Sequence, residues 1–149
     1  MRLAIVADDL TGAIDSAAAY RSFNPSANCI VIPWSIEPVH SWNQVFASHE
    51  PELLCISTDS RNIDAATAAQ RVSIATSWAL AHGFRLMKKI DSLMRGNVAS
   101  ELDAFMSEAT IAGCSFLFAP ALPNQGCVTA GGHQYHGSQL ITESEAAAD

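Results

Sequence analysis

The sequence predicts an α/β fold, a three-layer sandwich in which a largely parallel sheet carries helices on both faces. Short apolar runs typical of buried strands alternate along the chain with longer patterns typical of helices. Such alternation predicts right-handed crossovers and parallel strand pairing. With 149 residues, 49% of them hydrophobic and 15% charged, the chain is long and apolar enough for one domain with a substantial core. We therefore expect residues 1–149 to form a single domain.

The first half of the chain contains three predicted strands and one predicted helix. Apolar runs that read as buried strands occupy residues 3–7, 29–32 and 53–57. A face of small residues predicts a helix from residue 11 or 12 to residue 22, which Asn24 and Pro25 end. No element is predicted between residues 34 and 51.

The second half continues the alternation and ends in a hairpin. Helices are predicted at 65–81 and 98–112, with Asp64 and Asn97 as N-caps. The remaining predicted elements are strands at 84–90 and 115–119, a loop at 121–132, and a hairpin at 133–141 that turns at Gly137 and Ser138.

Charge and composition exclude several classes of partner. The net charge is -7, and the eight Lys and Arg residues are scattered, so we do not expect nucleic acid as a partner. No apolar run approaches the length of a membrane span, and the N-terminus has no leader pattern, so we expect no membrane contact and a cytoplasmic location. The four cysteines form no C-x-x-C pair, which predicts free thiols rather than disulfides.

Polar clusters follow four of the predicted strands, at residues 8–12, 58–61, 89–97 and 120–132. In a parallel sheet these clusters lie at one edge, where ligands bind. Lys89 and Arg95 are suited to hold a carboxylate or phosphate. Asp8, Asp9 and Asp91 are suited to accept hydrogen bonds from sugar hydroxyls, and one of them could act as a general base. This edge of the sheet therefore suits a small, polyhydroxylated, anionic ligand.

Each cluster also has a purely structural interpretation, and spacing alone leaves both open. Asp9 or Thr11 fits a helix cap, Asp91 and Asn97 fit turns, and Arg61 fits a surface ion pair. Two further kinds of site are rejected. The histidine pair His133 and His136 near Cys127 matches no strong metal signature, and neither G-x-x-x-x-G-K-[ST] nor G-x-G-x-x-G occurs.

Four longer motifs run in order along essentially the whole chain. They are Ile5-Val6-Ala7-Asp8-Asp9-Leu10-Thr11-Gly12-Ala13-Ile14-Asp15, then residues 57–61, then residues 88–97 with Glu101-Leu102, and then residues 119–126 with 132–135. Together they resemble the motifs of the four-carbon acid sugar kinases, formerly a family of unknown function. The family usually has threonine and leucine at Leu93 and Met94, and arginine at Cys127, where an anion contact would be lost.

The resemblance implies an ATP-dependent kinase that phosphorylates the terminal hydroxyl of an acid such as threonate or erythronate. In that family an N-terminal domain binds the acid sugar and a C-terminal domain binds ATP. The residues implied to line or help bind the substrate are Asp8, Asp9, Arg61, Lys89, Ser92, Arg95 and Asn97. Asp91 is added to them because it belongs to the polar clusters at the same edge of the sheet. The base would be Asp9 or Asp8.

The sequence stops at Asp149, before the expected ATP domain. We therefore expect this chain alone to be inactive and not to bind the ATP and Mg²⁺ that the family uses. Two functions remain open. One is the substrate-binding part of an acid sugar kinase, active only with a missing or separately encoded ATP domain. The other is a non-catalytic remnant that binds a small acid or a protein. An exposed sheet edge would also favour a homo-oligomer.

Overall fold

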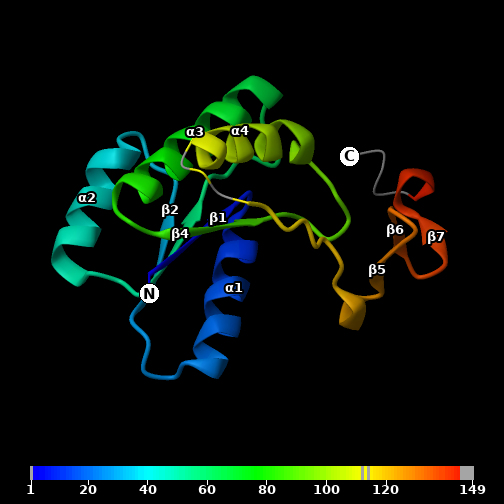
Figure 1. Ribbon diagram of the computed structural model, residues 1–149, viewed down its shortest axis with the longest axis horizontal. Coiled ribbons are helices and arrows are strands. Elements are labelled where there is room, and N and C mark those ends of the chain that lie inside the picture. Colours follow the sequence, from blue (N-terminus) through cyan, green and yellow to red (C-terminus); the bar gives the residue numbers. More distant parts are fainter. Residues whose placement is uncertain (1, 112, 114, 145–149) are drawn as a thin grey trace.

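The structure, a computed structural model, describes residues 2–111, 113 and 115–144. Its centre is a parallel sheet with the strand order β2-β3-β1-β4 (Figure 1). The strands are β1 (Leu3–Ala7), β2 (Cys29–Pro33), β3 (Leu53–Ser57) and β4 (Arg85–Lys89). β1 pairs in parallel with β3 on one side and with β4 on the other. The predicted parallel sheet is confirmed, and the carboxyl ends of these three strands lie side by side.

Helices cover both faces of the sheet, as a three-layer sandwich requires (Figure 1). They are α1 (Leu10–Phe23), α2 (Pro38–His49), α3 (Ala65–Ala81) and α4 (Val98–Ile111). Successive residues of a strand point to opposite faces, so β1 contributes to two cores. Ile5 and Ala7 pack with Ala13 of α1, whereas Ala4 and Val6 pack on the face that α3 covers. None of the described helices has both the length and the hydropathy needed to span a bilayer.

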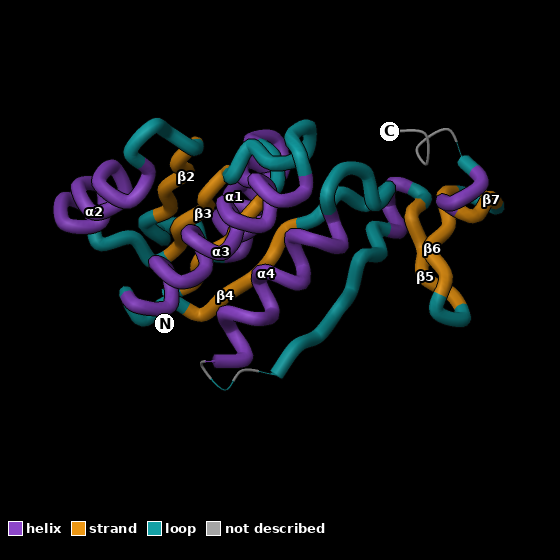
Figure 2. Tube along the Cα trace, turned by 90° about the horizontal axis from the view of Figure 1, so that it is seen from above, coloured by secondary structure: helices purple, strands orange, loops and turns teal. Residues whose placement is uncertain are grey.

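A second, antiparallel sheet follows the main sheet in the chain. It comprises β5 (Cys127–Ala130), β6 (His133–His136) and β7 (Gln139–Leu140), flanked by the 3-10 turns η1 (Pro123–Gln125) and η2 (Ile141–Glu143). Figure 2 shows it at the opposite end of the molecule from α2, joined to α4 by a long loop. The hairpin predicted at residues 133–141 is confirmed as β6 and β7, with Gly137 in the left-handed region at φ 61°.

The strand predicted at residues 115–119 is wrong. This segment is irregular, Leu117 is 91% exposed, and Phe116 packs its ring edge-on against Phe105 of α4. Residues with high strand propensity form a strand only where a neighbouring strand receives their backbone hydrogen bonds. Within the described residues, β4 pairs on one side with β1, and its other edge lacks a strand partner.

Two other segments hold elements that were not predicted from the sequence. α2 occupies most of the region in which no element was predicted, and of its residues Trp42 alone is buried. Trp42, Val45 and Phe46 nevertheless recur at spacings of three and four and pack in or against the core, so this apolar stripe was present in the sequence. β5 falls within the predicted loop at 121–132, and only Cys127 of its four residues is buried. The helix end predicted at Ala112 and the thiol of Cys114 lie outside the described residues.

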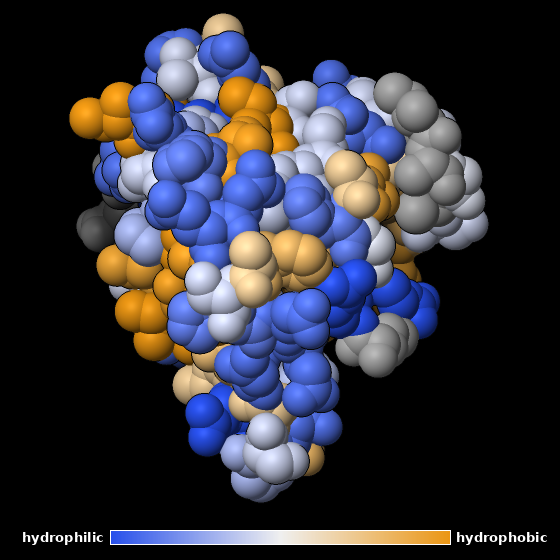
Figure 3. All heavy atoms as spheres, turned by 90° about the vertical axis from the view of Figure 1, so that its left-hand side faces the viewer, coloured by the Kyte–Doolittle hydropathy of each residue, from blue (hydrophilic) through white to orange (hydrophobic). Residues whose placement is uncertain are grey.

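The surface on the side of α2 is largely hydrophilic, with hydrophobic side chains in several separate groups (Figure 3).

Candidate functional site

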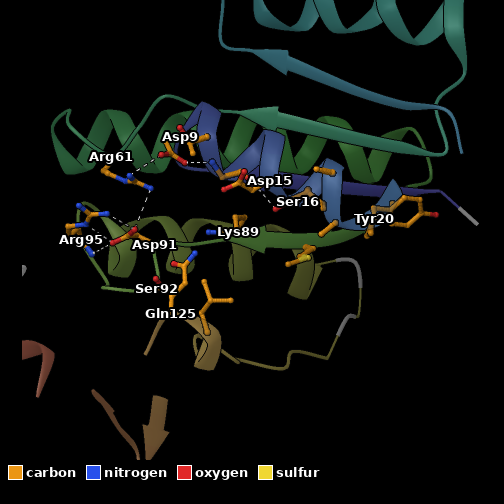
Figure 4. A pocket seen from close by; sticks show the side chains of 18 of the residues that line it. Asp9, Asp15, Ser16, Tyr20, Arg61, Lys89, Asp91, Ser92, Arg95 and Gln125 are labelled. Carbon is orange, nitrogen blue, oxygen red and sulfur yellow. Dashed lines mark hydrogen bonds and ion pairs between the residues drawn. The ribbon is translucent and has the colours of Figure 1, made fainter. Parts of the chain in front are cut away.

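A cavity of about 800 Å³ opens at the carboxyl end of the sheet and extends along α1 and β4 (Figure 4). Its walls come from α1, β1 and β4, from the loops after β3 and β4, and from residues 122–125. In a parallel sheet this is the edge at which ligands bind. Several of the polar clusters predicted to meet at this edge therefore border one cavity.

Arg61, from the loop after β3, gathers three carboxylates at one end of the cavity. Its Nε lies 2.7 Å from Asp8 Oδ2, its Nη1 2.9 Å from Asp9 Oδ2, and its Nη2 3.8 Å from Asp91 Oδ1. Burial opposes the charged guanidinium, but the hydrogen bond to Asp8 and the nearby carboxylates outweigh it and raise the pKa of Arg61. Segments far apart in the sequence are thus joined at one cation.

The two adjacent aspartates occupy different positions. Asp9 is the N-cap of α1, and its Oδ1 accepts a hydrogen bond from the Gly12 N–H at 2.7 Å. Asp9 also lines the cavity, so the helix cap and the predicted site coincide in one residue. Asp8 is 3% exposed and is not part of the cavity wall, and its Oδ1 has no hydrogen-bond partner among the described residues. Asp8 therefore affects the cavity only by its ion pair with Arg61, which lies in the cavity wall.

Asp91 and Arg95 form a second charge pair on the loop after β4. Arg95 Nε lies 2.7 Å from Asp91 Oδ2, and Arg95 Nη2 donates to Oδ1 at 2.9 Å, which is a bidentate arrangement. Burial would raise the pKa of Asp91, but the hydrogen bonds from Arg95 and the charges of Arg95 and Arg61 lower it below its ordinary value of 3.8. Asp91 is therefore an ionised hydrogen-bond acceptor at neutral pH.

Lys89, the last residue of β4, differs from the two arginines. Its Nζ donates to the Ile90 carbonyl oxygen at 2.7 Å, and no carboxylate lies within ion-pair distance of it among the described residues. It lies against the first turn of α1, where a Cβ added at Gly12 would be 3.3 Å from Lys89 Cγ and 2.7 Å from Asp9 Oδ1. Glycine at position 12 thus leaves space for the capping carboxylate of Asp9 and for the Lys89 side chain beside the helix.

Ser92 and Asn97, both expected to line the substrate pocket, are placed differently. Ser92 borders the cavity. Asn97 does not, because its Nδ2 donates to the carbonyl oxygens of Ser60 at 2.9 Å and Ile63 at 2.7 Å. The structure therefore brings six of the eight expected residues to the cavity wall, namely Asp9, Arg61, Lys89, Asp91, Ser92 and Arg95, and leaves Asp8 and Asn97 behind it.

Other wall residues were not singled out from the sequence as site residues. On α1 these include Thr11, Asp15, Ser16 and Tyr20, and Gln125 approaches from η1 (Figure 4). The α1 residues recur at helical spacings of three and four, so they share one face with Gly12. This spacing was available in the sequence. The contribution of Gln125 was not, because it depends on how the segment after α4 folds back.

The carboxylates of the site do not fit a magnesium site. Asp8 and Asp9 are ion-paired to Arg61, and Asp91 is ion-paired to Arg95. A second cation among these groups would meet the two guanidinium charges. Across the described residues, moreover, no group of three or more His, Cys, Asp or Glu side chains could hold a metal ion.

Comparison with known proteins links this geometry to a family. The family model for the sugar-binding N-terminal domain matches residues 3–149. A D-threonate kinase of Cupriavidus necator is 33% identical over 141 residues, which cover 95% of this chain and 31% of that protein. A D-erythronate kinase of Heliobacterium modesticaldum is 30% identical over 147 residues, covering 97% of this chain and 31% of that protein. The chain thus spans about a third of the length of these curated relatives.

Nearly the whole of this chain resembles part of a solved structure. It is a domain of unknown function from Bordetella bronchiseptica, a domain-swapped dimer with bound citrate. The two match with a TM-score of 0.81 and 32% identity, covering 99% of this chain and 36% of that one.

Proposed function

This chain belongs to the sugar-binding N-terminal domain family, and we propose that its cavity binds a four-carbon acid sugar. In this proposal residues 1–149 form the substrate-binding domain of an ATP-dependent kinase that phosphorylates the terminal hydroxyl of an acid such as threonate or erythronate. The names of the relatives support this substrate class, since they are kinases of D-threonate and D-erythronate. The cavity supports it independently, through the charges along its wall.

The observation that carries the proposal is the different state of the three cations at the cavity. Arg61 and Arg95 are each ion-paired to aspartates, whereas Lys89 is bonded to a backbone carbonyl oxygen. A carboxylate ligand would displace no ion pair at Lys89. We therefore assign the carboxylate of the acid sugar to Lys89, beside the first turn of α1, where the helix dipole also favours negative charge.

The sugar hydroxyls are assigned to the acidic end of the cavity. Asp9 and Asp91 are hydrogen-bond acceptors in the wall, and the Ser92 hydroxyl can donate or accept. The orientation of both carboxylates is fixed by the arginines, so the acceptors are preorganised for a polyol. A neutral polyol would make these contacts without the contact to Lys89, and we therefore expect it to bind more weakly than the acid.

We propose Asp9 rather than Asp8 as the group that accepts the proton of the reacting hydroxyl. A general base must come within hydrogen-bond reach of that hydroxyl. Asp9 lines the cavity, whereas Asp8 is buried behind Arg61. In this assignment Asp8 holds Arg61 in place, and Arg61 in turn orients Asp9.

The phosphoryl donor is proposed to bind elsewhere. ATP and Mg²⁺ supply the phosphoryl group and its charge neutralisation in kinases. The carboxylates of the cavity are held by arginines, and the sequence has no Walker-type phosphate cradle. We propose that another domain or a partner chain binds ATP and Mg²⁺ and that this chain alone is inactive. Turnover of D-threonate and ATP by the isolated chain would contradict this.

We also propose that the chain forms a homo-oligomer. Phe116, Leu117 and Phe118 are exposed on an irregular segment, and the outer edge of β4 has no strand partner among the described residues. Light scattering at micromolar concentration is expected to show a dimer or a larger species, and Leu117→Asp is expected to weaken it. A monomer at that concentration would contradict the proposal.

Titration calorimetry with D-threonate and D-erythronate tests the binding function directly. We expect heat of binding and a rise in Tm for at least one of the two acids. The absence of both signals for both acids would exclude D-threonate and D-erythronate as ligands of this cavity.

A further inference from the structure

A buried ion pair lies on the opposite face of β4 from the cavity. Lys88 Nζ is 2.6 Å from Glu101 Oε2 of α4, and the two side chains are 3% and 1% exposed. Because alternate strand residues point to opposite faces, Lys88 enters the core side while its neighbour Lys89 borders the cavity. The pair therefore does not touch the proposed ligand.

Glu101 is bonded in turn to the loop that carries Arg61. Its Oε1 accepts a hydrogen bond from the Ser60 hydroxyl at 2.7 Å, and that hydroxyl lies 2.7 Å from the Thr58 hydroxyl. Thr58 Oγ1 donates to the carbonyl oxygen of Ala7 at 2.8 Å. The Ser60 N–H donates to the carbonyl oxygen of Asp8 at 2.9 Å. A continuous chain of hydrogen bonds thus joins α4, the loop after β3 and the end of β1.

The two residues that precede α4, Gly96 and Asn97, also hold the backbone around Arg61. A Cβ added at Gly96 would lie 2.7 Å from Arg61 Cγ and 2.8 Å from its carbonyl oxygen, and Asn97 Nδ2 holds the carbonyl oxygen of Ser60. Gly96 and Asn97 therefore hold the backbone of Ser60 and Arg61 in one position. Glu101 fixes the hydroxyl of Ser60, the residue just before Arg61.

Stability alone is a weak explanation for this arrangement. Burying an ion pair costs desolvation energy that a pair of apolar side chains of similar size would avoid. Fully satisfied buried polar groups, however, specify one arrangement of the segments they join. Here those segments carry Arg61 and the aspartates that surround it.

We propose that Glu101, neutralised by Lys88, is a positioning residue that acts through Ser60 to hold Arg61 in contact with Asp8 and Asp9. The effect on the ligand rests on the proposed function, because it assumes that Asp9 binds the acid sugar. The effect on Arg61 itself does not depend on the ligand.

The test uses Ser60→Ala, because Glu101→Ala would leave Lys88 charged and unpaired in the core and is expected to unfold the chain. Ser73→Ala is the matched control. The Ser73 hydroxyl donates to Glu108 of α4 at 2.6 Å, a serine-to-glutamate bond that is only part-buried and lies far along α4 from Arg61. Two quantities are measured, the hydrogen-exchange rate of the Arg61 Nε–H by NMR and the Kd for D-threonate by calorimetry.

For Ser60→Ala we expect about tenfold faster exchange of the Arg61 Nε–H and about tenfold weaker binding, each equivalent to loss of one buried hydrogen bond. Ser73→Ala should change neither, and it should lower Tm less, because its bond is only part-buried and Glu108 keeps the Ser77 hydroxyl as a donor. Unchanged exchange in Ser60→Ala, or equal acceleration in Ser73→Ala, would overturn the positioning role. If the wild-type chain binds neither D-threonate nor D-erythronate, the proposed function fails, and the exchange measurement still decides whether Glu101 positions Arg61 through Ser60.

Discussion

Replacing Arg61 with methionine should destabilise the chain more than its partial exposure suggests. Asp8 depends on Arg61 for its charge partner, and the Asp8 side chain is only 4% exposed. Removing one partner of a buried ion pair costs roughly 3–5 kcal/mol, because the other charge stays buried and uncompensated. The Arg61 side chain is 20% exposed, so solvent can relieve part of this cost. We therefore expect Arg61→Met to lower the free energy of unfolding by about 3 kcal/mol.

Urea denaturation at pH 7 measures this loss, and Arg71→Met is the matched control. Arg71 donates to the carbonyl oxygens of Thr58 and Asp59 in the same loop, at 2.9 Å each, and its guanidinium lies over the Trp34 ring. No carboxylate lies within ion-pair distance of it among the described residues. Its replacement should cost about 1.5 kcal/mol, the lower end of the scale for hydrogen bonds from a charged donor, because it leaves no charge buried without a partner. Adding Asp8→Asn to Arg61→Met should restore about 1 kcal/mol or more by removing the buried charge. A loss no larger than that of Arg71→Met, or no recovery in the double variant, would show that the Asp8 charge does not depend on Arg61.

Three further predictions follow from the same geometry. Because the folded-state pKa of Asp91 lies below its ordinary value of 3.8, ionised Asp91 stabilises the fold above about pH 4, and this contribution is lost as the pH falls through the folded-state value. Urea midpoints between about pH 2.5 and pH 5 should therefore fall less steeply for Asp91→Asn than for the wild type, and parallel curves would contradict this. Gly12→Ala should lower Tm although alanine is the better helix former by about 1 kcal/mol, because the new Cβ would meet Asp9 Oδ1; an equal or higher Tm would show that the cap tolerates a side chain. Burial, with a smaller effect of Cys29, raises the pKa of Cys55 to about 12, so its thiol should resist a disulfide reagent at pH 8 until the chain unfolds, and rapid labelling of the folded chain would contradict the burial.

The parallel sheet could be predicted because the buried strands are continuous apolar runs. Leu53–Ser57 is buried along its whole length, and the N-caps Asp64 and Asp9 accept hydrogen bonds from the first turns of α3 and α1. Local chemistry was sufficient for these elements. Residues 115–119 show the opposite case, since their strand propensity is high and no strand forms there among the described residues. Pairing is decided by tertiary position, which composition does not report.

The site was predictable to the extent that topology alone determines it. Parallel pairing brings the ends of β1, β3 and β4 together, so residues following these strands meet at one cavity. The sequence could not show that Arg61 and Arg95 would be engaged by aspartates while Lys89 would not. Nor could it show that Asn97 points to the backbone of the neighbouring loop. These outcomes depend on side-chain directions at distances of a few ångströms.

The most direct test of the account is a calorimetric comparison of the wild-type chain with Lys89→Met and Lys89→Arg. The ligands are D-threonate and the neutral polyol D-threitol. We predict that the wild type binds D-threonate more tightly than D-threitol, that Lys89→Met weakens D-threonate binding by at least about tenfold, and that Lys89→Arg recovers part of it. Lys89→Met with unchanged affinity for D-threonate would contradict the assignment of the ligand's carboxylate to this lysine.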